Sequence, residues 1–146
     1  MKNFIALDTS GEYLTVIAKK GENTRVVFEE NCAMQHSVRL MDAIEEAAGA
    51  VGLAPAECDF FCAAVGPGSF TGIRIGISAV KGLCAATGKP SLGVTTFAAL
   101  AYNAEEKALA AFGGEPIRFR QPDRLIGSSF PGIKRDLQFR HLCRFQ

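Results

Sequence analysis

The chain has 146 residues, of which 48% are hydrophobic and 21% charged, and its net charge is +1. This is the length of one ordinary domain, and the apolar fraction is ample for a buried core. No apolar run approaches the ~20 residues of a membrane span, and Met1-Lys2-Asn3 leads into a strand rather than a signal peptide, so we expect a globular protein of the cytoplasm with no membrane partner.

Three strands are predicted first, over residues 3–9, 13–19 and 25–29, because each is a short run rich in apolar or β-branched residues. The turn signals Asp8-Thr9-Ser10-Gly11 and Gly21-Glu22-Asn23 separate them. Three consecutive strands joined by short turns predict an antiparallel meander.

An amphipathic helix is predicted next, ended by Gly52 and Pro55. One face is expected to carry its apolar residues, namely Val38, Leu40, Met41, Ile44, Ala47, Ala48 and Val51. A buried strand over 60–65, a helix from about 70 to 87, a short strand over 91–94 and a third helix from Thr95 or Thr96 to about Ala111 complete the order βββαβαβα.

The loop Gly66-Pro67-Gly68-Ser69-Phe70-Thr71-Gly72 joins the buried strand to the second helix. Gly66 and Gly68 permit positive φ, Pro67 stiffens the turn, and Ser69 or Thr71 can cap the helix, so its first N–H groups point into a crevice. The loop lacks the Lys of a P-loop, and its third glycine is one residue late for a dinucleotide fingerprint. A ligand or docking loop and a plain tight turn are equally good interpretations.

Five cysteines, at positions 32, 58, 62, 84 and 143, are an odd number without the second Cys or His pair of a zinc site. We expect reduced thiols that mostly fill the core, and neither a metal nor a cofactor.

The element order is the ribonuclease-H-like plan, one α/β lobe of the actin-like ATPase superfamily of actin, Hsp70 and sugar kinases, with helices on the faces of a mixed sheet. In that superfamily an Asp of the first hairpin lies near the nucleotide, and Asp8-Thr9-Ser10 resembles this segment. Asp8 closing a turn is the local alternative.

Three segments together resemble the TsaB (YeaZ) family: Ile5-Ala6-Leu7-Asp8-Thr9-Ser10, Gln35-His36-Ser37-Val38-Arg39-Leu40, and the loop from Gly66 through Ile73-Arg74-Ile75-Gly76 to Lys81-Gly82-Leu83. The resemblance covers residues 1 to about 110. It implies a subunit that partners the catalytic protein TsaD in making threonylcarbamoyladenosine in tRNA, with tRNA reached only through the complex. TsaE is a further candidate partner, and a homodimer is expected when the chain is alone.

The resemblance also implies that this subunit is not the catalyst. TsaD holds its metal with a His-x3-His pair, whereas here Leu40 stands four residues after His36, so His36 is best interpreted as a helix-start or interface residue. In the family the first two helices contact the partner. The expected interface residues are His36, Leu40, Ile44, Ile73, Arg74, Gly76, Ala79, Val80 and Leu83. Gly72 and Gly76 would let a partner helix approach closely; packing against the chain's own sheet is the alternative.

The resemblance stops near the end of the third predicted helix. Residues 1–110 carry 9 Lys and Arg against 12 Asp and Glu, whereas residues 111–146 carry 7 against 3. We therefore expect an actin-like first lobe over 1–111 and, over 112–146, an aberrant basic tail in place of a second lobe. A frameshifted second lobe and a divergent tail are both open hypotheses for it.

Two other functions compete with a non-catalytic scaffold. A nucleotide-binding phosphotransferase of the same superfamily would need a second lobe to close over the nucleotide. A stand-alone nucleic-acid-binding domain would need a basic folded face with stacking aromatics, whereas the folded part is net negative.

Overall fold

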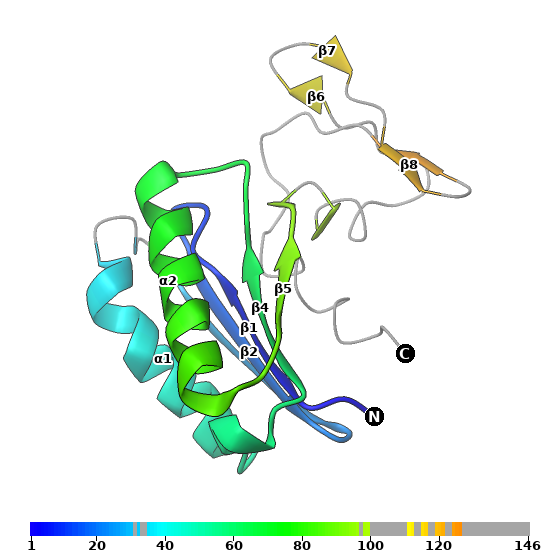
Figure 1. Cartoon of the computed structure of the whole chain (residues 1–146). Coiled ribbons are helices and arrows are strands. Elements are labelled where there is room, and N and C mark those ends of the chain that lie inside the picture. The colour runs from blue at the N-terminus through cyan, green and yellow to red at the C-terminus, as the bar shows by residue number, and fades with distance from the viewer. Residues whose placement is uncertain are drawn as a thin grey trace. The chain divides into compact units, whose positions relative to one another are not determined.

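A five-stranded mixed sheet is the frame of the first part of the chain in the computed structural model (Figure 1). Its order is β3-β2-β1-β4-β5. The strands are β1 (Phe4–Asp8), β2 (Leu14–Lys20), β3 (Asn23–Glu29), β4 (Phe60–Ala64) and β5 (Ser91–Val94). The first three form the predicted antiparallel meander, and β4 and β5 join in parallel, as the ribonuclease-H-like plan requires.

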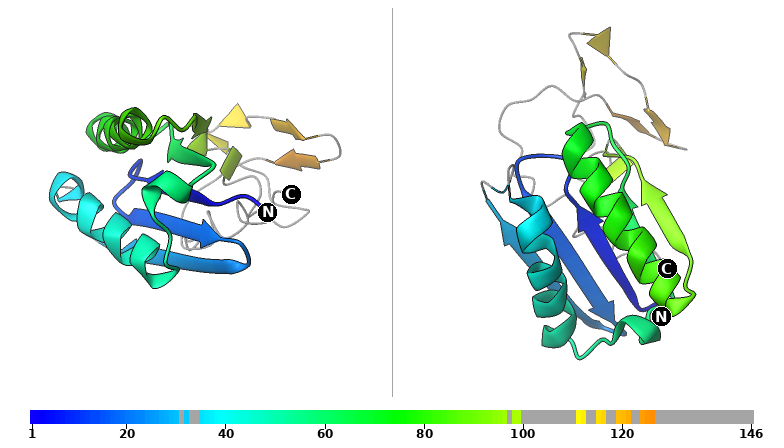
Figure 2. Two further views of the ribbon diagram at one scale, coloured as in Figure 1. Left: turned by 60° about the horizontal axis from the view of Figure 1, so that its bottom comes forward. Right: turned by 60° about the vertical axis from the view of Figure 1, so that its left-hand side comes forward.

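Two helices cover one face of this sheet and run side by side in all views (Figures 1 and 2). They are α1 (His36–Ala50) and α2 (Phe70–Thr87). Strand alternation sends every second residue toward them. The resulting core joins sheet and helix residues: Ile5, Leu7, Leu14, Val16, Phe61, Ala63, Leu40, Ile44, Ala47 and Val80.

The turn between β2 and β3 explains their register. Lys20 pairs with Asn23 across a two-residue loop, and Gly21 has φ +58°, the left-handed conformation that such a tight hairpin needs. Lys20 and Gly21 of this hairpin also form hydrogen bonds with segments outside it.

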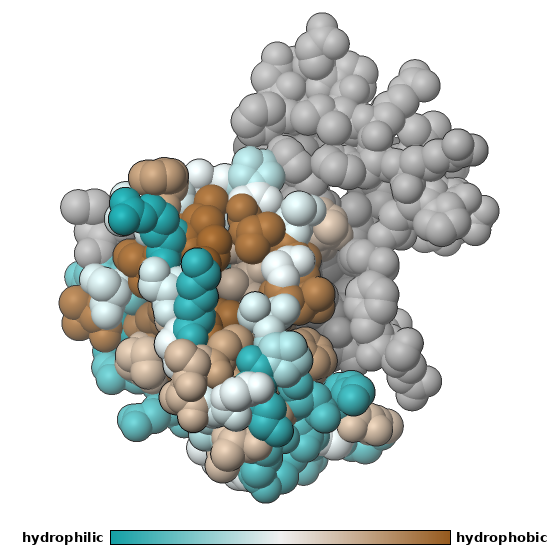
Figure 3. Space-filling view, in the orientation of Figure 1, coloured by the Kyte–Doolittle hydropathy of each residue, from teal (hydrophilic) through white to brown (hydrophobic). Residues whose placement is uncertain are grey.

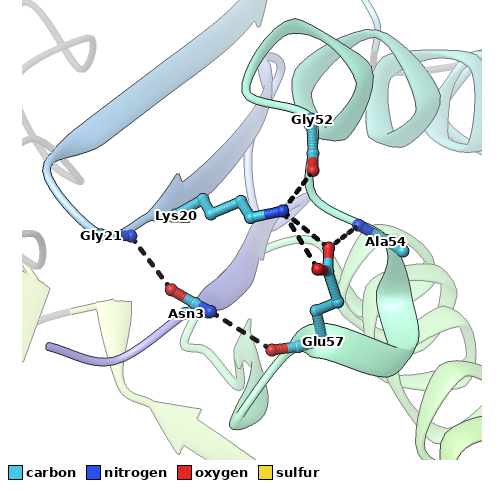
Figure 4. Close-up of polar contacts among 6 residues, drawn as sticks. All are labelled: Asn3, Lys20, Gly21, Gly52, Ala54 and Glu57. Carbon is cyan, nitrogen blue, oxygen red and sulfur yellow. Dashed lines mark hydrogen bonds and ion pairs between the residues drawn. The ribbon is translucent and has the colours of Figure 1, made fainter.

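A polar cluster fastens the segment after α1 to this hairpin (Figure 4). The Lys20 ammonium donates to the Gly52 carbonyl oxygen at 2.7 Å and to both Glu57 carboxylate oxygens at 2.9 and 3.1 Å. The Glu57 carboxylate also accepts from the Ala54 N–H, capping the short 3-10 helix η1 (Pro55–Glu57). Asn3 completes the cluster by accepting from the Gly21 N–H at 3.0 Å. These hydrogen bonds and this ion pair therefore stabilise the packing of the β2–β3 hairpin against the segment after α1.

The core-facing side of the first helix differs from the prediction. Val38 and Met41 were expected on the core face of the first helix, but their exposed fractions are 71% and 52%. The reason is their position around the helix axis, because they project away from the stripe of α1 that contains Leu40 and Ile44 and packs on the sheet.

The third predicted helix falls mostly outside the described residues. Thr96 and two residues that follow it are helical, and the predicted end at Ala111 instead lies in a strand.

The structure describes residues 1–30, 32, 35–96 and 98–99, and the backbone of residues 111–112, 115–116, 119–121 and 124–126. Contacts divide the chain after Thr96. The second unit holds two small hairpins, β6 (Ala111–Phe112) with β7 (Glu115–Pro116) and β8 (Phe119–Gln121) with β9 (Arg124–Ile126). That the first lobe reaches residue 111 and is followed by a tail stays a prediction. Within the described ranges, no helix is long and apolar enough to cross a bilayer.

Candidate functional site

The predicted site segments meet at the carboxyl edge of the sheet, where β1, β4 and β5 all end. Asp8, Thr9 and Ser10 are almost fully buried there, with exposed fractions of 8%, 1% and 7%. The Ser10 N–H donates to Asp8 Oδ1 at 2.8 Å, and the Ser69 N–H donates to the Ser10 carbonyl oxygen at 2.7 Å. The Asp8 carboxylate thus closes its own turn, and the glycine loop is fastened to that turn.

The loop is closed from the β5 side as well. The Thr96 N–H donates to the Gly66 carbonyl oxygen at 2.8 Å, and its hydroxyl donates to Ser10 Oγ at 3.4 Å. Gly66 takes the positive φ that the sequence suggested, at +103°, and its bond to Pro67 is cis. Gly68 is needed for a different reason, since a Cβ there would collide with the Ser10 carbonyl.

Of the two predicted caps of α2, the structure uses Ser69. Its hydroxyl oxygen accepts from the Gly72 N–H at 3.2 Å, as an N-cap residue does, whereas Thr71 is exposed within the first turn. The Ser69 and Gly72 amides are therefore occupied within the chain. The outer side of the loop, with Pro67 and Thr71, faces solvent.

Gly72 and Gly76 pack against the chain's own strand end. The Thr9 hydroxyl donates to the Gly72 carbonyl oxygen at 2.7 Å, and a Cβ added at Gly72 would collide with the Thr9 carbonyl. A Cβ at Gly76 would lie 2.5 Å from Thr9 Oγ1. The expectation that Gly76 admits a partner helix is therefore corrected: the glycines bring α2 close to β1, which is the alternative that the sequence left open.

We call this arrangement of residues 8–10, 66–72, 76 and 96 the glycine clasp. Among the described residues, no group of three His, Cys, Asp or Glu side chains is placed to hold a metal ion. Cys62 lies in β4 below the clasp, and burial raises the pKa of its thiol to about 12, so it is a protonated core residue at neutral pH. Burial likewise raises the pKa of Cys58 to about 11. Neither thiol is prepared as a nucleophile.

A second feature is a groove of about 380 Å³ between the two helices. Its lining combines apolar side chains, three hydroxyls and one arginine: Ser37, Leu40, Met41, Thr71, Arg74, Ile75, Ser78 and Ala79. Unlike the clasp, the groove is open to solvent and is bordered by side chains from both helices. It is therefore shaped to receive another molecule.

Large apolar side chains stand exposed beside this groove. Phe70 is 74% exposed, and it joins Val38 and Met41 on the same side of the lobe. In the space-filling view, brown side chains gather around the upper, N-terminal half of α2, with teal residues standing among them (Figure 3). We call Ser37, Val38, Met41, Phe70, Thr71, Arg74 and Ser78 the two-helix face. Apolar groups exposed together in this way mark interaction sites more often than single exposed residues do.

The predicted interface residues fall into three groups. Arg74 and Ala79 line the groove, and Leu40, only 2% exposed, forms its floor. Ile73 and Leu83 are half-buried. The core itself holds the others, namely His36, Ile44, Gly76 and Val80.

His36 is a core residue with one satisfied ring nitrogen. Its Nε2 lies 3.1 Å from the Tyr13 carbonyl oxygen, which can only accept, so Nε2 carries the proton. Its Nδ1 is buried and has no hydrogen-bond partner among the described residues. This single imidazole ties the start of α1 to the β1–β2 turn. It is not available to another molecule, which corrects its assignment to the interface.

Val38, Met41 and Phe70 were missed as residues of an exposed apolar surface, although the sequence held a signal for them. The apolar residues of the first helix extend too far round it to meet one sheet, which indicates a second apolar surface. Phe70 at the exposed start of a helix is a similar signal.

Comparison with known proteins gives the same assignment from sequence and from structure. The sequence profile of the family described as "TsaD: tRNA N6-adenosine threonylcarbamoyltransferase" matches residues 17–114. The chain is 31% identical over 103 residues to the tRNA threonylcarbamoyladenosine biosynthesis protein TsaB of Escherichia coli, covering 70% of this chain and 44% of that protein. It is 33% identical over 103 residues to TsaB of Haemophilus influenzae, covering 70% and 43%.

Among solved structures, YeaZ from Pseudomonas aeruginosa superposes with a TM-score of 0.67 at 28% identity, covering 88% of this chain and 65% of that one. The predicted fold class is confirmed. The chain spans less than half the length of the curated relatives that it matches.

Proposed function

Because the chain belongs to the TsaD family of tRNA N6-adenosine threonylcarbamoyltransferases, and within it to the TsaB (YeaZ) branch, we propose that it is a non-catalytic subunit that binds the threonylcarbamoyltransferase in the modification of tRNA to threonylcarbamoyladenosine. The observation that carries this proposal is the two-helix face: an open groove with Val38, Met41 and Phe70 exposed around it.

The contrast between the two candidate sites supports a binding role. A transferase site needs groups that bind the substrate and transfer protons, and these groups must line an open pocket. The clasp instead uses the Ser10 and Ser69 amides and Asp8 Oδ1 for hydrogen bonds within the chain. The imidazole of His36 is buried. The groove has the opposite properties, since it is open, largely apolar and free of any titrating base.

The proposed partner is the threonylcarbamoyltransferase subunit, and tRNA is reached only through the complex, in the cytoplasm. A second copy of the chain is the competing occupant of the same face when the transferase is absent. TsaE is a further candidate subunit of the complex, and a contact of the glycine loop with a nucleotide or a partner stays a prediction.

The test is binding of the full chain to the purified threonylcarbamoyltransferase of the same organism, measured by calorimetry. Met41→Glu places a charge on the two-helix face and is expected to abolish binding while the chain stays folded, because Met41 is half exposed. Leu92→Glu is the matched control. Leu92 is 51% exposed on β5 and pairs with Cys62, on the side of the sheet away from the helices, so this variant should bind like the unmodified chain.

Two results would contradict the proposal. One is equal affinity of the Met41→Glu and unmodified chains. The other is threonylcarbamoyl transfer by the purified chain alone that is lost on mutation of any of its residues.

A further inference from the structure

Arg74 differs from Arg25 and Arg39, the other two arginines whose side chains the structure describes. The guanidinium of Arg25 is ion-paired with Glu46, and that of Arg39 with Glu29, both at 2.8 Å. Arg74 makes no ion pair with any described residue, and α2 contains no acidic residue that could supply one. It is exposed nonetheless in the wall of an apolar groove.

The position of Arg74 is fixed by an aromatic ring. Its guanidinium carbon lies 5.3 Å from the centroid of the Phe70 ring, one helical turn earlier. A cation over a ring at this distance is held by the charge distribution of the ring while its N–H groups stay free to donate. Arginine is among the residues that most often dominate binding energy at interfaces, and phenylalanine is enriched there.

We infer that Arg74 is the specificity-determining residue of the two-helix face, and that it selects a partner helix carrying an Asp or Glu carboxylate flanked by apolar residues. This inference rests on the proposed function and adds the chemistry of the partner. A helix laid along the groove would cover Met41 and Ile75 with its apolar residues and bring a carboxylate to the guanidinium. The three hydroxyls of the groove, on Ser37, Thr71 and Ser78, would accept or donate at its edges.

Charge complementarity favours a partner helix with a carboxylate over an uncharged helix. An apolar helix would desolvate the guanidinium and leave its donors unpaired, which penalises binding, whereas a carboxylate pairs with it in a partly apolar setting. The arginine therefore disfavours partners without the carboxylate as well as favouring those with it. A second copy of the chain that packed α2 on α2 around Arg74 would bring the two arginines together, so this arrangement is disfavoured.

The experiment compares variants of the full chain in calorimetric binding to the threonylcarbamoyltransferase at low and high salt. Arg74→Met keeps an unbranched apolar stem but no charge, and Arg74→Glu reverses the charge. Lys81→Met is the matched control, because it removes one charge from the same helix outside the groove lining. We expect Kd to rise at least about tenfold for Arg74→Met and further for Arg74→Glu, with a flatter salt dependence, and little change for Lys81→Met.

The outcomes separate the two proposals. If Met41→Glu abolishes binding but Arg74→Met binds like Lys81→Met, the role of Arg74 is overturned and the proposed function stands. If the unmodified chain does not bind the transferase at all, both are overturned. If Arg74→Glu disrupts only a homodimer and leaves transferase binding unchanged, Arg74 contacts a second copy of the chain and not the transferase, and the inference is wrong.

Discussion

Substitution of Gly76 tests the packing of α2 on β1. An added Cβ would lie 2.5 Å from the hydroxyl oxygen of Thr9, a 1%-exposed residue whose stiff β-branched side chain has little room to move. Alanine gains about 1 kcal/mol of helix propensity. Overpacking costs about 1–3 kcal/mol, and disturbing the Thr9–Gly72 hydrogen bond about 1 kcal/mol more. We expect Gly76→Ala to lower the free energy of unfolding by about 1–3 kcal/mol in urea titrations, and Gly76→Leu to prevent folding.

Two controls make this test specific. Gly82 lies in the same helix with nothing within 4 Å of an added Cβ, so Gly82→Ala should raise the free energy of unfolding, by up to about 1 kcal/mol. Thr9→Ala removes the colliding atom, so the Thr9→Ala, Gly76→Ala double variant should be more stable than the sum of the single effects predicts. A Gly76→Leu chain that stays folded but no longer binds its partner would refute the packing described here, because Gly76 would then face outward.

Three further predictions concern the cap, the thiols and acid stability. Ser69→Ala removes the hydroxyl that accepts from the Gly72 N–H, so the free energy of unfolding should fall by about 1 kcal/mol; a change below a few tenths would contradict the capping role. In peptide-mapped alkylation of the native chain at neutral pH, half-buried Cys84 should react well before Cys58 and Cys62, whose pKa values burial raises to about 11 and about 12; equal rates would be the contrary result. The Arg39 guanidinium lowers the pKa of Glu29 below 4.5 by hydrogen bonding, so the pair stabilises the fold above that value and its contribution is lost as the pH falls through the lowered pKa. Glu29→Gln should weaken the acid dependence of unfolding below pH 4.5, and a curve identical to that of the unmodified chain would count against the pair.

Much of the fold could be predicted because local pattern and tertiary structure agree. The apolar and β-branched runs of the first three segments, the turn at Gly21 and the helical spacing from Phe70 each point to the element that forms there. Contacts between distant segments also followed from topology. Residues 8–10 and 66–72 end neighbouring parallel strands, so the strand order alone places them together.

Which side of each helix faces the sheet could not be predicted in the same way. A row of small residues, such as Gly72 and Gly76, allows close approach on whichever side it faces, and the sequence does not say whether β1 or another molecule lies there. The same limit applies to the first helix. Its apolar residues cover more than one stripe, and only the structure shows that Leu40 and Ile44 meet the sheet while Val38 and Met41 remain exposed.

Hydroxyl-radical footprinting in the presence of the threonylcarbamoyltransferase shows whether the partner covers the two-helix face. Met41 and Met1 are 52% and 69% exposed, so Met1 is an internal control for Met41. A saturating amount of transferase is expected to slow the oxidation of Met41 and of Phe70 severalfold and to leave that of Met1 unchanged. Oxidation of Met41 and Phe70 at their free rates in the saturated complex would show that the two-helix face is not where the partner binds.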